Sequence, residues 1–273
     1  MDDYVRGNQQ LWEEWADINF RSAAYDVAGF KAAPDALRPL IREGVGDVAG
    51  KSLLYLQCHF GKDTLRWALL GASVTGIDFS AKAIAYAQQL ATDMHIPATF
   101  VSADLYDLPQ VLPDQQEQFD VVFTSDGVLG WLPDLERWGE IVGRFLKPGG
   151  VFFIYEAHPM LMIFDDTQPA ALRVKYPYFH QPEPLVFAPH VGTYADPNAV
   201  VTQTEYAWQH SLADIVNSLL RAGLRLDYLG EYPQVSWQAL PFLAPDAQGD
   251  WRLPPEYPPL PLSFALRAVK ART

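Results

Sequence analysis

The sequence predicts an α/β protein built on a doubly wound parallel sheet. Between residues 47 and 158, short apolar runs of strand length alternate with segments whose apolar residues recur at helical spacing. This alternation is typical of right-handed β–α–β units, in which helices cover both faces of a parallel sheet. Acidic residues follow several of the apolar runs. In such sheets the ligand binds beyond the carboxyl ends of the strands.

Five strands are predicted in this zone, at residues 52–56, 73–77, 99–101, 119–124 and 151–155. The helix after the first strand ends at Gly71, because glycine readily adopts the left-handed conformation of a helix end. Ser80 caps the helix after the second strand, since its hydroxyl can accept a hydrogen bond from a free backbone N–H. A helix over 135–145 ends before the sequence Lys147-Pro148-Gly149-Gly150.

We expect a single domain, 1–273, with four parts. The insertion after the core holds seven of the 22 prolines, and long loops of this kind in a compact domain are typically lids. The cap and the insertion are therefore expected to cover the ligand edge of the sheet. The four parts are an N-terminal helical cap (1–46), a ligand-binding core (47–158), an insertion or lid (159–205) and the C-terminal part of the sheet (206–273).

The composition disfavours several classes of function. The chain has 33 acidic and 20 basic residues and a net charge of -13 at pH 7. Such a surface repels nucleic-acid backbones and anionic membranes, so we expect neither as a partner. Cys58 is the one cysteine, which excludes an internal disulfide, and no metal site is expected. The sequence shows no signal peptide and no apolar run of membrane length, so a cytoplasmic location is the default; the oligomeric state stays open.

Groups at the ends of the first three strands are suited to an adenosine compound with an anionic tail. The turn 57–61 leads from a strand into a helix, whose free backbone N–H groups favour a carboxylate or phosphate. Asp78 ends the second strand, where a carboxylate can bind both ribose hydroxyls. Asp104 follows the third strand and can accept a hydrogen bond from an adenine amino group.

A dinucleotide is the less favoured ligand. The dinucleotide fingerprint G-x-G-x-x-G would place glycines where this chain has Gln57, His59 and Lys62. These side chains obstruct the close backbone approach that a pyrophosphate needs, whereas a methionine carboxylate requires less. An NAD-type oxidoreductase on the same fold is the alternative function, which titration with a nicotinamide cofactor would distinguish.

Taken together, the motifs resemble those of class I S-adenosylmethionine (SAM)-dependent methyltransferases. The matching segments have the family's order and spacing, and they lie at 53–64, 74–80, 103–105, 119–123 and 146–150. The resemblance implies a Rossmann-like sheet, mostly parallel, whose last strand at 262–269 is antiparallel and pairs near 224–230. The first motif LQCHFG, at 56–61, and the sequence Glu156-Ala157-His158-Pro159 resemble an uncharacterised bacterial subgroup.

The resemblance also implies SAM as cofactor and S-adenosylhomocysteine (SAH) as product. The chain departs from the family where Tyr55 replaces an acidic residue and where Gln57 and His59 replace glycines. We therefore expect Gln57 to donate to the methionine carboxylate, and the carbonyl of Cys58 or Ser125 to accept from the α-amino group. The implied cofactor-binding residues are Gln57, Cys58, His59, Gly61, Asp78, Phe79, Ala103, Asp104, Leu105 and Ser125.

Glu156 and His158 are the candidate catalytic residues. They follow the fifth strand, and Pro159 keeps His158 extended. Side chains two apart on an extended chain share a face, so the carboxylate can orient the imidazole as a general base. The alternative is that this pair braces the insertion against the sheet.

We expect transfer of a methyl group from SAM to a small-molecule acceptor. A SAM-binding protein without catalysis is the second alternative. Aromatic residues of the flanking segments are suited to walling a cleft for an apolar or cationic substrate, and they are equally suited to pinning long loops to the domain. They include Trp12, Trp15, Tyr25, Tyr176, Tyr178, Phe179, Phe187, Tyr194, Trp237 and Trp251.

Overall fold

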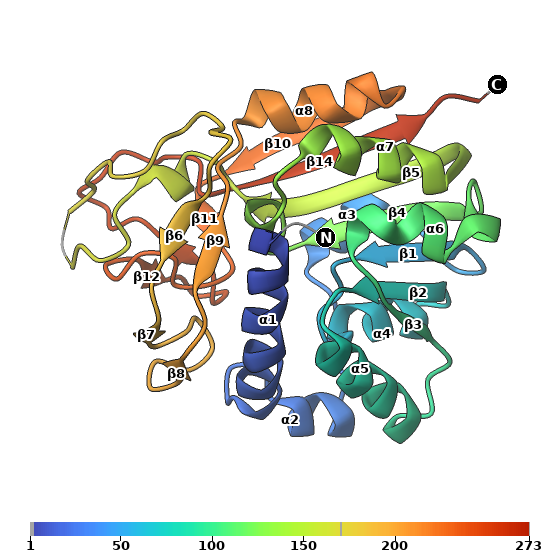
Figure 1. The fold of residues 1–273 in the computed structure, drawn as a ribbon, viewed down its shortest axis with the longest axis horizontal. Helices are drawn as coiled ribbons and strands as arrows, with labels where there is room; N and C mark the ends of the chain where they lie inside the picture. Colours follow the sequence, from blue (N-terminus) through green and yellow to red (C-terminus); the bar gives the residue numbers. More distant parts are fainter. Residues whose placement is uncertain (1–2, 170, 273) are drawn as a thin grey trace.

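A seven-stranded sheet forms the centre of the computed structural model, which describes residues 3–169 and 171–272 (Figure 1). Its strands are β1 (Ser52–Leu56), β2 (Ser73–Asp78), β3 (Thr99–Ser102), β4 (Phe119–Ser125), β5 (Leu146–Ala157), β10 (Leu224–Tyr232) and β14 (Ser263–Lys270). They lie in the order β10-β14-β5-β4-β1-β2-β3. Four residues lie outside the described part of the chain: 1–2 of the predicted cap, 170 of the insertion and 273 of the predicted C-terminal part.

The strand directions confirm the predicted fold class. Strands β3, β2, β1, β4 and β5 are parallel, whereas β14 is antiparallel to both β5 and β10. One predicted boundary is wrong, because β5 begins at Leu146, immediately after a helix, and not at residue 151. Phe119 of β4 pairs with Leu146 and Val121 with Val151, so β5 bulges between the two pairs. Gly149 permits the bulge, since its φ of 80° lies in the left-handed region.

Helices cover both faces of the sheet, as predicted. Trp138 packs on Phe152 on one face, and Trp67 packs on Phe123 on the other, in two separate apolar clusters. Ser80 caps its helix as expected, because its hydroxyl accepts a hydrogen bond from the N–H of Ala83 at 3.0 Å. The helices are α6 (Leu108–Val111), α7 (Leu135–Phe145) and α8 (Leu212–Arg221) on the first face, and α3 (Pro39–Val45), α4 (Lys62–Leu69) and α5 (Ala81–Asp93) on the second.

The carboxyl edge of the sheet is covered by α1 (Asp3–Arg21), followed by α2 (Val27–Ala32), and by the insertion. Figure 1 shows α1 between the main sheet and two short hairpins. Asn8 of α1 exchanges two hydrogen bonds with the backbone of Tyr206, at 2.7 and 2.9 Å. Glu14 accepts from the N–H of Thr202 at 3.0 Å. The hairpins pair β6 (Leu185–Phe187) with β9 (Glu205–Ala207), and β7 (His190–Val191) with β8 (Val200–Val201).

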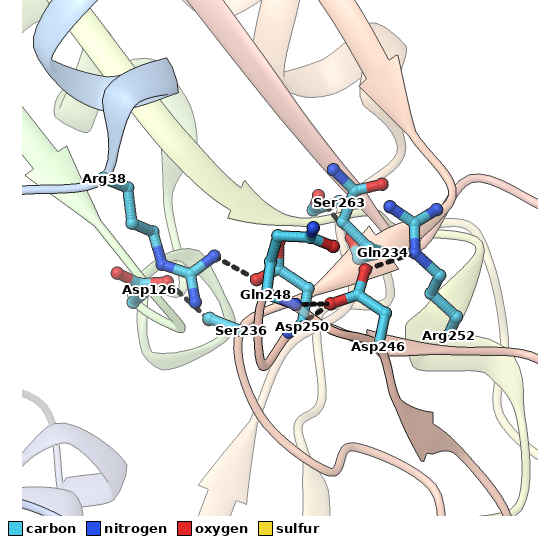
Figure 2. A network of polar contacts seen from close by, with 9 residues as sticks. All are labelled: Arg38, Asp126, Gln234, Ser236, Asp246, Gln248, Asp250, Arg252 and Ser263. Carbon is cyan, nitrogen blue, oxygen red and sulfur yellow. Dashed lines mark hydrogen bonds and ion pairs between the residues drawn. The ribbon is translucent and has the colours of Figure 1, made fainter.

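The segment between β10 and β14 leaves the main sheet and builds a second, small one. That sheet has the order β11 (Gln234–Val235), β13 (Trp251–Arg252) and β12 (Ala244–Pro245). Figure 2 shows the polar network that joins it to the core. Arg38, before α3, pairs with Asp250 at 2.5 Å, and the hydroxyl of Ser236 donates to Asp126 at 2.9 Å. These contacts hold residues 234–237 over the end of β4.

Helices α7 and α8 approach each other closely where α7 presents a glycine. A Cβ atom placed on Gly139 would lie 2.5 Å from the carbonyl oxygen of Ser218 in α8. Backbone cannot give way as a flexible side chain can, so this position accepts only glycine without a shift of α8.

Replacing Gly139 with alanine is expected to lower the free energy of unfolding by about 1–3 kcal/mol, because overpacking displaces α8. This figure is the net loss that remains after the helix-propensity gain of about 1 kcal/mol. Urea unfolding measures the change. Gly130→Ala is the matched control, since its Cβ would meet only the Trp208 carbonyl oxygen at 3.8 Å. Equal stability of the two variants would contradict the close approach.

Candidate active site

A cavity of about 500 Å³ lies at the carboxyl edge of the sheet. Its floor comes from the ends of β1, β2, β4 and β5 and its roof from α1, the insertion and residues 234–237. All of the predicted cofactor-binding residues line this one cavity: Gln57, Cys58, His59, Gly61, Asp78, Phe79, Ala103, Asp104, Leu105 and Ser125. The structure thus brings the predicted set together, while its role in binding SAM stays a prediction.

The first turn has a glycine-like backbone although two of its residues are not glycine. Gln57 and His59 have φ angles of 58° and 51°, and Gly61 has 76°. A left-handed conformation costs a non-glycine residue about 1–2 kcal/mol. Hydrogen bonds hold it in place: the amide nitrogen of Gln57 donates to the Val128 carbonyl at 3.1 Å, and the N–H of His59 donates to Asp78 at 2.8 Å. The turn therefore has left-handed backbone at both positions where the family has glycines.

Asp78 ends β2 as a buried carboxylate that fixes this turn. One of its oxygens accepts from His59 and the other from the N–H of Ser80 at 2.9 Å. Burial raises the pKa of Asp78 to about 6, against the opposite effect of these hydrogen bonds. Each carboxylate oxygen can accept a second hydrogen bond, so Asp78 retains acceptor capacity toward the cavity.

Asp104 and Phe79 line the cavity at the β2–β3 end of the sheet. Asp104 accepts from the N–H of Tyr106 at 3.0 Å, and burial raises the pKa of the Asp104 carboxyl. The carbonyl of Phe79 accepts from the side chain of Gln9 in α1 at 2.7 Å, which ties the cap to this strand end. Ala103 and Leu105 flank Asp104.

Tyr55 stands where an acidic residue is typical of the family. Its hydroxyl is 2.8 Å from the hydroxyl of Ser125 at the end of β4. Burial raises the pKa of the Tyr55 phenol well above its usual value, so the group is neutral. The site thus replaces a carboxylate at the centre of the sheet by a neutral hydrogen-bonded pair.

Glu156 is occupied by the backbone of the loop that follows β4. Its carboxylate accepts from the N–H groups of Gly127 and Val128, both at 2.7 Å, and from Leu129 at 3.4 Å. Burial raises the pKa of Glu156 to about 7. It lines the cavity, and its hydrogen bonds brace the loop after β4, which is not the insertion named in the bracing alternative.

His158 does not pair with Glu156. Its Nε2 is 2.8 Å from the carboxylate of Glu231 in β10, and its Nδ1 accepts from the N–H of Met160 at 2.9 Å. It is absent from the cavity wall, whereas Ala157 and Pro159 belong to it. The two-residue spacing predicts a shared face only on an extended strand, but β5 ends at Ala157 and a turn begins beyond it. Catalysis by this pair remains an untested prediction without support from the geometry.

The histidines in the cavity wall are neutral. Burial lowers the pKa of His59 to about 3 and that of His210 to about 4. Among the described residues, no three His, Cys, Asp or Glu side chains gather into a possible metal site. The same part of the chain contains no helix with the length and hydropathy of a membrane span.

Aromatic rings form much of the roof. Trp12 and Trp15 of α1, Tyr25, Tyr194 of the insertion, and Trp237 line the cavity, as the flanking sequence suggested. Trp131 and Trp208 also line it and were missed, because both lie in segments that read as ordinary core sequence. The other aromatics considered, Tyr176, Tyr178, Phe179, Phe187 and Trp251, are not part of the wall.

Glu205 is a further residue that sequence analysis missed. It lies in β9, where alternate side chains point to opposite faces: Glu205 and Ala207 line the cavity, whereas Tyr206 packs on Tyr4 of α1. Burial raises the pKa of Glu205 to about 7, and Asp166 adds to the shift. A strand of three residues inside a proline-rich segment gives no periodic signal that could have revealed its inward face.

Comparison with known proteins identifies the core. Residues 54–154 match the family model described as a methyltransferase domain. An uncharacterized methyltransferase of Synechocystis sp. is 29% identical over 205 residues, which are 74% of this chain and 78% of that protein. This match extends well beyond the core. These matches support SAM-dependent methyl transfer by this chain, and residues 54–154 are similar to a methyltransferase domain.

The other similarities place limits on what is transferred to this methyltransferase. A ubiquinone biosynthesis O-methyltransferase of Pseudomonas syringae pv. tomato is 38% identical over 110 residues. That match covers 39% of this chain and 45% of the relative, so less than half of the relative is compared. A methyltransferase structure from Mesorhizobium loti has a TM-score of 0.58 at 23% identity and covers 85% of this chain and 96% of that one, which shows the shared fold. SAM is the methyl donor, and the NAD-type alternative is set aside.

Glu156→Gln is expected to lower the free energy of unfolding by about 1–3 kcal/mol, because a side-chain amide turns a donor toward Gly127 or Val128. Turnover of the remaining folded enzyme, measured as SAH formed from SAM in a metabolite extract, should stay near that of the parent. Glu140→Gln, on the exposed side of α7, is the control. Normal stability with a loss of turnover of about 10²–10⁴-fold would instead identify Glu156 as a base.

The carboxyl of Glu205 should make stability depend on pH. Its pKa is raised in the folded state, so the folded protein holds the proton more tightly than the unfolded chain does. The contribution of Glu205 to the free energy of unfolding is therefore favourable at low pH, and it is lost as the pH rises from the pKa of the unfolded chain to about 7. Between about pH 5 and about pH 8, the parent should lose roughly 1–2 kcal/mol more than Glu205→Gln. Urea unfolding at the two pH values tests this, with exposed Glu256→Gln as control. Parallel losses in all three proteins would contradict the shift.

Proposed function

We propose that this enzyme transfers the methyl group of SAM to a small-molecule acceptor bound between the sheet edge and its roof. The observation that carries the proposal is the cavity of about 500 Å³, which lies within the range of small-molecule sites. Segments from both ends of the chain and from the insertion roof it over. This roof limits the access of a macromolecular acceptor, and the net charge of -13 disfavours nucleic acid.

The donor side of the cavity is proposed to run along β3, β2 and β1. Asp104 is suited to the adenine amino group, Asp78 to the ribose hydroxyls and the turn Gln57–Gly61 to the methionine part. The buried side-chain oxygen of Gln57 lacks a hydrogen-bond partner among the described residues, which supports a ligand at this turn. Because the strand order continues to β4 and β5, the reactive end would lie toward Ser125 and Asp126.

When bound, SAM supplies a methyl group that is already activated by the positive sulfur. The protein's contribution is then to orient the acceptor and to exclude water. Trp12, Trp15 and Tyr194 supply an apolar wall for this purpose. Tyr25 and Tyr194 share a hydrogen bond of 2.8 Å between their hydroxyls, and Asn19 donates to Tyr194 at 2.8 Å. These two hydrogen bonds join α1 to the insertion and hold the roof in place.

The relatives do not supply the acceptor. The ubiquinone biosynthesis O-methyltransferase is named for methyl transfer to oxygen, but its match covers only 39% of this chain. The roof that would select the acceptor comes mostly from outside residues 54–154. We also propose a cytoplasmic location, as expected from the sequence.

Asp78→Asn is expected to weaken SAH binding by about 10–100-fold, because it removes a charged acceptor from the ribose hydroxyls. Isothermal titration calorimetry measures the affinity, and a melting curve confirms that the variant is folded. Asp93→Asn, which removes an exposed partner of Lys31, is the matched control. Unchanged affinity in a folded Asp78→Asn variant would overturn the proposed donor site.

A further inference from the structure

The roof of the cavity carries a carboxylate that the protein itself does not use. Glu205 lines the cavity from β9, and its carboxylate has no hydrogen-bond or ion-pair partner among the described residues. Glu205 is half-buried, and a carboxylate that is partly removed from water is ordinarily paired, because losing hydration is costly. An unpaired one facing a cavity therefore indicates a group that is supplied by a ligand.

Glu205 and the tryptophans line the same cavity. Segment β8–β9 runs antiparallel along α1, because Tyr206 bonds to Asn8 and Thr202 bonds to Glu14. The ring of Tyr206 packs on α1, so Glu205 points to the other face of β9 and into the cavity. On its other side, the N–H of Trp208 donates to the carbonyl of Gly130 at 2.8 Å, next to Trp131.

Three of these rings form one contiguous wall. The ring centroids of Trp12 and Trp15 are 5.1 Å apart, those of Trp12 and Trp131 5.3 Å, and those of Trp15 and Trp131 5.8 Å. Tyr194 extends the wall at 5.7 Å from Trp15. Tryptophan faces attract cations through the negative potential above the ring.

The charges around the cavity have the same sign. Its two basic side chains are already engaged, since Arg66 pairs with Asp35 and Asp63, and Lys62 donates to the carbonyl of Tyr25. A carboxylate or phosphate on the acceptor would thus meet repulsion from the acidic side chains of the cavity. The acidic residues that line the cavity are Asp63, Asp78, Asp104, Asp126, Glu156 and Glu205.

We propose that the methyl acceptor carries a cationic amine, and that Glu205 with the tryptophan wall selects it by its positive charge. This inference rests on the proposed small-molecule methyl transfer. Glu205 supplies the anion that a desolvated ammonium requires, and the rings of Trp12, Trp15 and Trp131 replace its water on the other sides. Asp63 and Asp126 are already engaged, the first by Arg66 and the second by the hydroxyl of Ser236.

Three probes of matched shape test the selection: phenethylamine, 2-phenylethanol and 3-phenylpropionate, which present an ammonium, a hydroxyl and a carboxylate on the same phenylethyl frame. Each is titrated by calorimetry into the full-length protein saturated with SAH. The titrations are run at about pH 8, where a carboxyl with a pKa of about 7 is largely ionised. Glu205→Gln is compared with the parent and with Glu256→Gln, an exposed control outside the cavity.

The parent and Glu256→Gln should bind phenethylamine at least about tenfold more tightly than 2-phenylethanol, with 3-phenylpropionate weakest. Glu205→Gln should remove most of the preference for the amine while leaving the affinities for the alcohol and for SAH unchanged. Equal binding of amine and alcohol by the parent, absence of amine binding, or a preference that survives Glu205→Gln would each overturn the inference. The SAH titration separates the two proposals: failure to bind SAH would overturn the donor site, whereas normal SAH binding without amine preference would overturn only the selection.

Discussion

The active-site floor depends on two buried carboxylates that hold the loops at the ends of the central strands. Asp78 of β2 accepts from the turn after β1, and Glu156 of β5 accepts from the loop after β4. In each case, the carboxylate at the end of one strand accepts hydrogen bonds from backbone N–H groups in the loop that follows the neighbouring strand. These N–H groups have no partner within a strand or helix, so the carboxylates satisfy donors that burial would otherwise leave unpaired.

This arrangement explains how the chain keeps the family's turn without the family's glycines. Gln57 and His59 adopt left-handed conformations, and the hydrogen bond from His59 to Asp78 helps to offset their strain. Asp126 is a third such residue, with a φ of 60° in the loop that Glu156 holds. Three of the six non-glycine residues with positive φ among the described residues thus lie at the proposed site, and the sheet beneath supports them.

The acceptor side is assembled from several separate segments instead of neighbouring strand ends. Its wall comes from α1, from η3 (Leu129–Trp131), from β9 and from residues 234–237, which are far apart in the sequence. Contacts such as Asn8 to Tyr206 and Ser236 to Asp126 join these segments (Figure 2 shows the second). Small apolar clusters of its own, such as Leu11, Trp15 and Val201, also hold the roof together, apart from the two clusters that pack on the main sheet. That separation accounts for the match of residues 54–154 to a general methyltransferase domain.

The sequence by itself determined the sheet and the residues at its edge. Apolar periodicity located β1 to β4 closely, because a strand buried under helices on both faces must be apolar along its length. Strand ends then placed Asp78 and Asp104, since parallel strands present their carboxyl ends on one side. Only the tertiary structure decided the start of β5 at Leu146. The sequence Pro148-Gly149-Gly150 usually indicates a turn, but a bulge at Gly149 lets the strand continue through it. It also decided that His158 lies beside Glu231 and that Glu205 faces the cavity. These last features arise from contacts between segments distant along the chain, and local sequence patterns carry no record of such contacts.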